Sequence, residues 1–273
     1  MAPVFIIIIL LYLISSIGYL AFLFSQQERL HRISYGVMLT GFLAHTGLIG
    51  YKCILLESIP VYNLHQTLSF AAWTLAGVYL LIKYKFRLNI LGAYAAPLAT
   101  IIMVAAYWIP EAPGEHGSLF KSLWLILHVV IIFIGEAALA LACGAGILYL
   151  IQEHAIKSKT NRFFRKRLPS LELLDATGYV FIFTGFTLLT VGLITGFIYA
   201  QQVWGRFWSW DPKEIWSGIT WLIYAALLHE RLVAGWRGRR AAIMAIIGFA
   251  AVIFTFLGVN LFLEGHHETF TKW

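Results

Sequence analysis

Charged residues are scarce in this chain of 273 residues. Aspartate, glutamate, lysine and arginine make up 12% of it, whereas 60% of the residues are hydrophobic. So few charges cannot cover a water-soluble domain of this size, because charged side chains normally form about a quarter of such a sequence. Several apolar runs reach the roughly 20 residues that a helix needs to cross a bilayer. The composition therefore excludes a soluble globular protein and predicts an all-α integral membrane protein.

Cysteine is scarce as well. Only Cys53 and Cys143 are present, in or beside apolar runs and far apart in the sequence. No C-x-x-C pair exists, which excludes a thioredoxin-like redox motif and a covalent haem attachment motif. The first apolar run has no basic residue before it and no small-x-small cleavage site, so we expect a retained helix rather than a signal peptide. Without internal repeats or low-complexity linkers, residues 1–273 are predicted to form a single polytopic membrane domain.

Eight apolar segments are long enough to form a bundle of about eight transmembrane helices. They are expected at residues 3–24, 34–55, 64–82, 88–108, 119–151, 173–200, 212–232 and 241–263. The net charge of +7 does not indicate nucleic-acid binding, since 15 of the 20 Lys and Arg residues fall in alternate loops, on one side of the membrane. The positive-inside rule assigns that side to the cytoplasm. Both termini are therefore predicted to be extracytoplasmic, in a multi-pass protein of the inner or plasma membrane.

The most informative stretch joins the sixth and seventh predicted spans, at residues 201–216. It contains four of the ten tryptophans, at positions 204, 208, 210 and 216. Tryptophan has a flat apolar body and one N–H donor, which suits a membrane–water interface. One tryptophan would be an anchor, but four, interleaved with charged residues, indicate a surface for a large flat amphipathic ligand. We expect Trp204, Arg206, Trp208 and Trp210 to contact that ligand.

Asp211 has two interpretations. With Pro212 after it and Glu214 three residues later, it fits a helix start, in which Asp211 is the N-cap and Glu214 completes a capping box. Alternatively, Asp211 belongs to the ligand-binding surface. The sequence leaves both roles open.

Two of the nine histidines are predicted on the same side of the membrane as the tryptophan stretch. His128 lies about eight residues into the fifth predicted span, roughly 12 Å below its outer end, and His267 follows the eighth span. Neutral imidazole is a common ligand of haem iron. A lone intramembrane histidine can equally be a hydrogen-bonded packing residue, and His267 can equally lie in a solvated tail. His229, by contrast, lies near the inner end of the seventh span.

The tryptophan stretch resembles the "WWD" signature of the haem-handling proteins of cytochrome c biogenesis, which include CcsA (ResC), CcmC and CcmF. The resemblance runs from about Gly41 to about His267, and the residues from Ile219 to His229 are most similar to the CcsA branch. It implies an extracytoplasmic WWD loop that binds non-covalent haem b between two axial histidines. Two family motifs contain these axial histidines. In this chain they correspond to Trp124-Leu125-Ile126-Leu127-His128 and to Gly258-Val259-Asn260 followed by Gly265-His266-His267.

The resemblance thus implies that His128 and His267 are ligands of the haem iron. The family has a single histidine where this chain has His266-His267; spacing selects His267, and His266 remains the alternative. His229 matches a family histidine of an inner haem site. His45 is assigned to packing or a channel contact, and the role of His65 is left open.

Other polar residues have simpler expectations. His31, His116 and His154 are expected to be solvated in loops. Glu136, in the middle of the fifth span, should face protein or a polar path, because an exposed carboxylate is costly in lipid.

By resemblance, the chain would act in System II cytochrome c maturation. It would present haem for thioether attachment to apocytochrome c, with a CcsB (ResB) membrane subunit, as part of a cytochrome c synthase (haem lyase) complex. Arg206 or Lys213 would pair with the haem propionates, or would only anchor the chain at the membrane interface. No catalytic residue is assigned. Two alternatives stay open: a HemX-type non-catalytic or regulatory haem-binding protein, which the short chain slightly favours, and a small-molecule transporter whose tryptophans form an interfacial belt.

Overall fold

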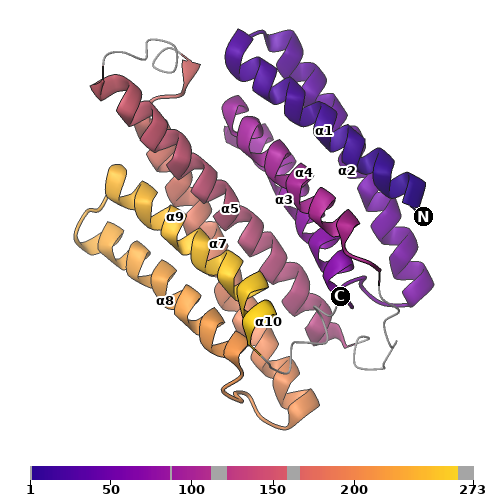
Figure 1. Ribbon diagram of the computed structural model, residues 1–273. Coiled ribbons are helices and arrows are strands. Elements are labelled where there is room, and N and C mark those ends of the chain that lie inside the picture. Colours follow the sequence, from indigo (N-terminus) through magenta and orange to yellow (C-terminus); the bar gives the residue numbers. More distant parts are fainter. Residues whose placement is uncertain (1, 87, 112–121, 159–166, 264–273) are drawn as a thin grey trace.

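The computed structural model describes residues 2–86, 88–111, 122–158 and 167–263, and this part of the chain contains no strand. Eight long helices form an antiparallel bundle (Figure 1): α1 (Ala2–Ser25), α2 (Glu28–Leu56), α3 (Leu64–Phe86), α4 (Gly92–Trp108), α5 (Leu123–Lys157), α7 (Leu171–Trp204), α8 (Pro212–Val233) and α9 (Arg239–Ile253). A 3-10 turn (Asn89–Leu91) precedes α4, and a π-helical turn (Phe254–Gly258) joins α9 to the short α10 (Val259–Phe262). The predicted all-α class and the eight predicted helical segments are confirmed.

The helices form two groups of four (Figure 1). Helices α1 to α4 pack against one another, and α5, α7, α8 and α9 form the second group, with α5 also packed against α3. The longest helices, α5 and α7, share the most extensive interface. Glycines allow this close approach: a Cβ on Gly185 would lie 2.5 Å from the Leu139 side chain. Small residues at helix interfaces are typical of membrane bundles, where close backbone packing replaces the hydrophobic effect.

Six of the described helices are long and apolar enough to cross a membrane, which supports a multi-pass membrane protein. They are α1, α2, α4 with its preceding turn, α5, α7, and α9 with the π-helical turn. Helices α3 and α8 are more polar because they carry side chains that face the protein interior. His65 and Ser69 of α3 are buried, and Lys213 and Ser217 of α8 line a cavity.

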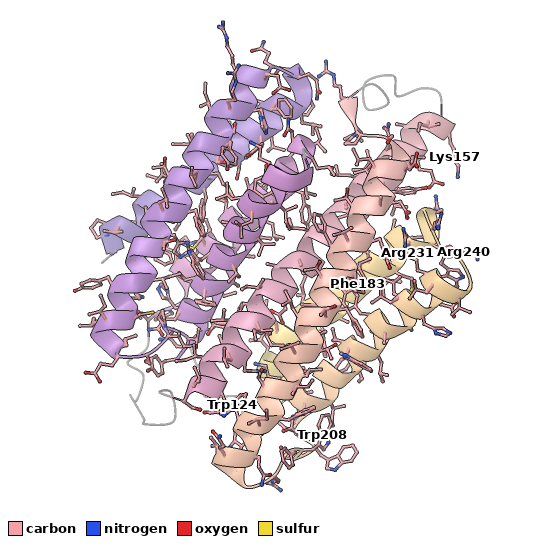
Figure 2. The ribbon with its side chains drawn as sticks, turned by 180° about the vertical axis from the view of Figure 1, so that it is seen from behind. Trp124, Lys157, Phe183, Trp208, Arg231 and Arg240 are labelled. Atoms are coloured by element: carbon pink, nitrogen blue, oxygen red, sulfur yellow. The ribbon has the colours of Figure 1, made fainter. Side chains whose placement is uncertain are left out.

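The connections between helices alternate between the two ends of the bundle. Figure 2 shows Trp124 and Trp208 at one end and Lys157, Arg231 and Arg240 at the other. We refer to these as the tryptophan end and the basic end. The predicted separation of the tryptophan stretch from most basic residues is therefore present in the fold.

Ion pairs connect neighbouring helices at the basic end. The Arg231 guanidinium donates to both carboxylate oxygens of Asp175, at 3.0 and 2.8 Å, and joins α8 to α7. Glu153 of α5 accepts from Lys157 at 2.7 Å and from Arg239 at 3.0 Å. These contacts fix the relative positions of α5, α7, α8 and α9 at the end distant from the tryptophans.

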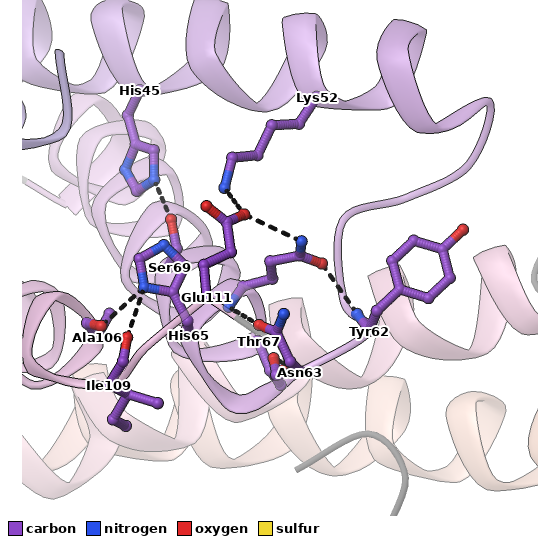
Figure 3. Close-up of polar contacts among 11 residues, drawn as sticks. His45, Lys52, Tyr62, Asn63, His65, Thr67, Ser69, Ala106, Ile109 and Glu111 are labelled. Carbon is purple, nitrogen blue, oxygen red and sulfur yellow. Dashed lines mark hydrogen bonds and ion pairs between the residues drawn. The ribbon is translucent and has the colours of Figure 1, made fainter. Parts of the chain in front are cut away.

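A second polar network ties together the other group of helices at the tryptophan end (Figure 3). Lys52 donates to Glu111 at 2.5 Å, and the Gln66 amide donates to the same carboxylate oxygen at 3.2 Å. Burial raises the pKa of Glu111, but the hydrogen bonds from Lys52 and Gln66 outweigh it, so the net pKa is lowered. The network connects α2 and α3 to the segment that follows α4.

Candidate functional site

A cavity opens between α5, α7, α8 and the π-helical turn, at the tryptophan end of the bundle. It encloses about 170 Å³, whereas a single water needs only about 10–15 Å³ on the same measure. Its wall is largely apolar and aromatic, with a few polar groups directed into it. The aromatic lining residues are Phe133, Phe197, Tyr199, Trp204 and Phe256, and the titratable ones include His128, Glu136, Lys213 and Glu214.

One face of α5 brings two polar side chains, His128 and Glu136, into the wall of this cavity. His128, Ile132 and Glu136 follow one another at intervals of four residues and all three line it. Residues four apart lie above one another on the same side of a helix. The expectation that Glu136 faces protein or a polar path is confirmed.

The imidazole of His128 is held against the backbone of α7. Its Nδ1 lies 2.7 Å from the carbonyl oxygen of Gly192, and because a carbonyl can only accept, Nδ1 carries the proton. This tautomer places the ring lone pair on Nε2, the arrangement found in metal-binding histidines. Gly196 permits the approach, since a Cβ there would lie 2.8 Å from both Cε1 and Nδ1 of the ring.

The tryptophans of the 201–216 loop occupy different depths. Trp204 is the last residue of α7 and lines the cavity, and Gly205, with a φ of 71°, ends the helix in the left-handed conformation. Trp208 packs edge to face against Phe197, with 5.8 Å between ring centroids. Trp210 is 75% exposed and packs edge to face against Trp208, also at 5.8 Å.

The loop also carries a strained residue and an exposed cation. Trp210 has a φ of 60°, which is unusual for a bulky residue. Strain of this kind persists only where surrounding contacts impose it, and it clusters at functional sites. Arg206 is exposed at the surface of the loop.

Asp211 starts α8 as the first interpretation predicted. Its Oδ1 accepts from the Lys213 backbone N–H at 2.9 Å, while Glu214 Oε2 accepts from the Asp211 and Ser209 backbone N–H groups at 3.3 and 2.7 Å. Pro212 is the first residue of the helix, and the capping box is complete. The helix-start role of Asp211 is confirmed, and a direct ligand contact stays a prediction.

The structure separates His229 from His128. His229 is exposed near the basic end of α8, about 25 Å along the helix from its first residue. His266 and His267 lie outside the described residues. The last described segment, α10, packs against α8.

The other histidines that the structure describes lie in the α1–α4 group or at the basic end. His45 is fully buried between the Tyr12 hydroxyl, 3.2 Å from Nδ1, and the Ser69 hydroxyl, 2.9 Å from Nε2, which matches the packing role. His65 Nδ1 donates to the backbone carbonyl of Ala106 at 2.8 Å (Figure 3), and the residue does not line the cavity.

The expectation for His31 was wrong. It is only 4% exposed, because the start of α2 folds it against Phe22 and Tyr19 at the end of α1. His154 is exposed as expected, and His116 lies outside the described residues.

Two features of the cavity were not found from the sequence. The π-helical turn contributes Thr255 and Phe256 to the wall, and no residue pattern predicts it, although such turns often occur at functional sites. The Lys213 side chain reaches the same cavity as Glu136. The sequence did contain a signal for this shared position. It has a lysine at the start of one predicted span and a carboxylate in the middle of another.

The cytochrome C assembly protein family model matches residues 61–267. The chain belongs to this family. The match begins just before α3 and includes α3, α5, α7, α8 and α9, the long helices around the cavity.

Curated relatives identify the CcsA branch of the family. The chain is 34% identical to the cytochrome c biogenesis protein CcsA of Guillardia theta, over 94% of this chain and 92% of that protein. It is 33% identical to the CcsA of Synechococcus elongatus, over 90% and 89% of the two chains, and 31% identical to that of Gloeobacter violaceus, over 93% and 91%. The resemblance to CcsA-type cytochrome c biogenesis proteins is confirmed.

A solved structure shares the fold. The cytochrome c haem lyase CcmF superposes with a TM-score of 0.66 over 98% of this chain, at 16% sequence identity. This chain spans about half of that longer protein, 47% of its length. At this identity the likeness shows the fold alone.

Proposed function

We propose that this chain handles haem in cytochrome c biogenesis, by binding non-covalent haem b in the cavity beneath the tryptophan loop and presenting it to apocytochrome c. The observation that carries the proposal is the state of His128. Its Nδ1–H is committed to the Gly192 carbonyl, its lone pair is on Nε2, and it lines the cavity. Because the chain belongs to the cytochrome C assembly protein family, we take haem, the cofactor of cytochrome c, as the ligand.

The residues present fit a haem group. A flat macrocycle needs an imidazole ligand, apolar walls and aromatic contacts, and the cavity combines His128 with Phe197, Phe256 and Trp204. His128 would supply one axial ligand and His267, or His266, the second. Two imidazoles fill both axial positions of the iron, which limits its reaction with oxygen or stray ligands. The bound group supplies vinyl carbons for thioether formation; the protein positions it and restricts access of water.

The tryptophan loop would cover the group and meet the acceptor. Trp204 and Trp208 would contact the macrocycle, Trp210 would extend the aromatic surface outward, and Arg206 would approach it from the exposed side. Asp211 would act mainly by fixing the start of α8. We place this loop and both termini outside the cytoplasm, in a single polytopic domain of the inner or plasma membrane.

The proposal includes a partner. A CcsB (ResB)-type membrane subunit would complete a cytochrome c synthase with this chain, and His229 would form half of an inner haem site. Its exposed position at the basic end of α8 leaves it accessible to a second subunit.

The direct test is the absorption spectrum of the full-length protein purified from haem-replete cells. A Soret band with low-spin features is expected. His128→Ala should weaken haem retention, and added imidazole should restore it by occupying the vacant coordination position. His154→Ala, an exposed histidine at the other end of the same helix, is the matched control and should change neither. An unchanged low-spin spectrum in His128→Ala would refute the proposed ligation.

A second test addresses the tryptophans. Replacing Trp208 and Trp210 together with alanine should reduce co-purified haem while membrane yield stays near normal. Loss of the protein from the membrane would instead indicate the anchoring role. A wild-type protein without any Soret band would favour the transporter alternative.

A further inference from the structure

Two oppositely charged side chains line the cavity without forming a hydrogen-bonded ion pair with each other. Glu136 on α5 and Lys213 on α8 both line it, and they are close enough to interact electrostatically. Yet in the part of the chain that the structure describes, neither charged group makes a hydrogen bond or an ion pair.

Two other acidic groups on α5 and α7, Glu153 and Asp175, are paired. Asp175 is bound by Arg231 through both carboxylate oxygens, and Glu153 accepts from two basic side chains. A buried charge without a partner costs several kcal/mol, so such groups normally meet a counter-ion, water or a ligand. Because both Glu136 and Lys213 line an open cavity rather than packed core, a molecule bound in the cavity can pair with them.

We propose that Lys213 is the binding group for a carboxylate of the cavity's ligand, and that Glu136 is the resident counter-charge with which that carboxylate competes. The inference rests on the proposed function, since a haem carries two propionate groups on one edge of the macrocycle. Lys213 lies in the first turn of α8, where the positive end of the helix dipole adds to its attraction for an anion. Glu136 is a positioning residue that directs the ammonium into the cavity.

The arrangement gives the second contact that an axial ligand alone does not provide. A macrocycle held only by the His128 imidazole can rotate about the iron–nitrogen bond. A carboxylate bound to Lys213, on a different helix, removes that rotation. It therefore decides which edge of the macrocycle is presented at the opening of the cavity, and positioning of this kind is what accelerates a reaction between two bound partners.

The test compares haem with haem dimethyl ester, in which both carboxylates are neutral, by titrating the purified full-length apoprotein and following the Soret band. Wild type should bind haem about tenfold or more tightly than the ester, as a charge-assisted hydrogen bond requires. Lys213→Met should lose this preference while still binding the ester, which shows that the cavity is intact. Lys213→Arg should keep the preference.

Glu136→Gln separates a binding role from a structural one. Removing the competing carboxylate should maintain or increase the preference for haem over the ester, opposite in direction to Lys213→Met. The matched control is Lys157→Met, which removes another lysine near a glutamate, at the basic end, and should leave the preference unchanged.

Equal binding of haem and ester by wild type would overturn the inference while leaving the proposed haem binding intact. A loss of preference of the same size in Glu136→Gln and Lys213→Met would also overturn it, because it would show that the pair only supports the fold. Absence of a Soret change with either compound would overturn the proposed function itself.

Discussion

Gly196→Ala is the sharpest probe of how α7 positions His128. The added methyl carbon would lie 2.8 Å from both Cε1 and Nδ1 of the imidazole, whereas carbon atoms in contact prefer about 3.5–4.0 Å. The ring must therefore retreat by roughly 0.7 Å or more. It cannot do so and keep the 2.7 Å hydrogen bond to Gly192, because N–H···O bonds lie within about 2.7–3.2 Å.

The expected effect of Gly196→Ala on stability is the sum of two opposing contributions, and its effect on haem affinity is estimated separately. Overpacking costs about 1–3 kcal/mol, and replacing glycine by alanine within a helix returns up to about 1 kcal/mol. The protein should therefore still fold and insert. Disturbing the hydrogen-bond partner of a metal-binding histidine typically lowers affinity about 10- to 100-fold, so a loss of haem affinity in that range is expected.

The assay is a haem titration of the purified apoprotein, with the thermal unfolding midpoint measured in parallel. The control is Gly178→Ala, also on α7, where the new Cβ would meet only Ala145 at 3.7 Å, an ordinary contact. That variant should bind haem like wild type. If Gly196→Ala matches wild type in both affinity and spectrum, then either His128 is not the ligand or α7 does not set its position.

Four further outcomes are expected. Glu111 has a lowered pKa in the folded state, so its stabilisation is present above the unfolded pKa and lost as pH falls through the folded value; Glu111→Gln should flatten the fall in thermal midpoint between about pH 5 and pH 3. Asp175→Asn should cost about 1–3 kcal/mol, measured by thermal unfolding, because the neutral amide removes the counter-charge of the half-buried Arg231 guanidinium and can accept only one of its two hydrogen bonds; Arg231→Met in the same chain should recover part of this loss. Trp210→Gly should raise the unfolding midpoint by relieving a left-handed conformation that costs about 1–2 kcal/mol, whereas Trp210→Ala should not. A reporter active only in the cytoplasm, fused after Trp273, should stay silent; an active fusion would reverse the proposed orientation.

The sequence predicted those features that depend only on residues close together in the chain. The start of α8 follows from Asp211, Pro212 and Glu214, because a capping box involves only residues within one turn. The helical segments follow from apolar length alone. His128 was recognised with its surrounding motif, and the structure then supplied its hydrogen-bond partner.

Features that depend on contacts between distant segments were not predictable in the same way. His31 was expected in solvent because it lies in the polar loop between the first two predicted spans, but the packing of α1 against α2 buries it. Gly192 and Gly196 read as ordinary small residues until α7 is placed against His128. The shared cavity of Glu136 and Lys213 likewise exists only once α5 and α8 are assembled.

The lengths of α5 and α7 decide where in the membrane the cavity lies. These helices contain 35 and 34 residues, about 50 Å at 1.5 Å per residue, whereas the hydrocarbon layer is about 30 Å thick. If the excess is shared between both sides, each end projects roughly 10 Å beyond the hydrocarbon. His128 lies five residues after the start of α5, about 8 Å along the helix, and so falls at the level of the lipid headgroups. A water-soluble acceptor could then reach the mouth of the cavity from the aqueous phase without displacing lipid, while the floor of the same cavity remains shielded by the bilayer.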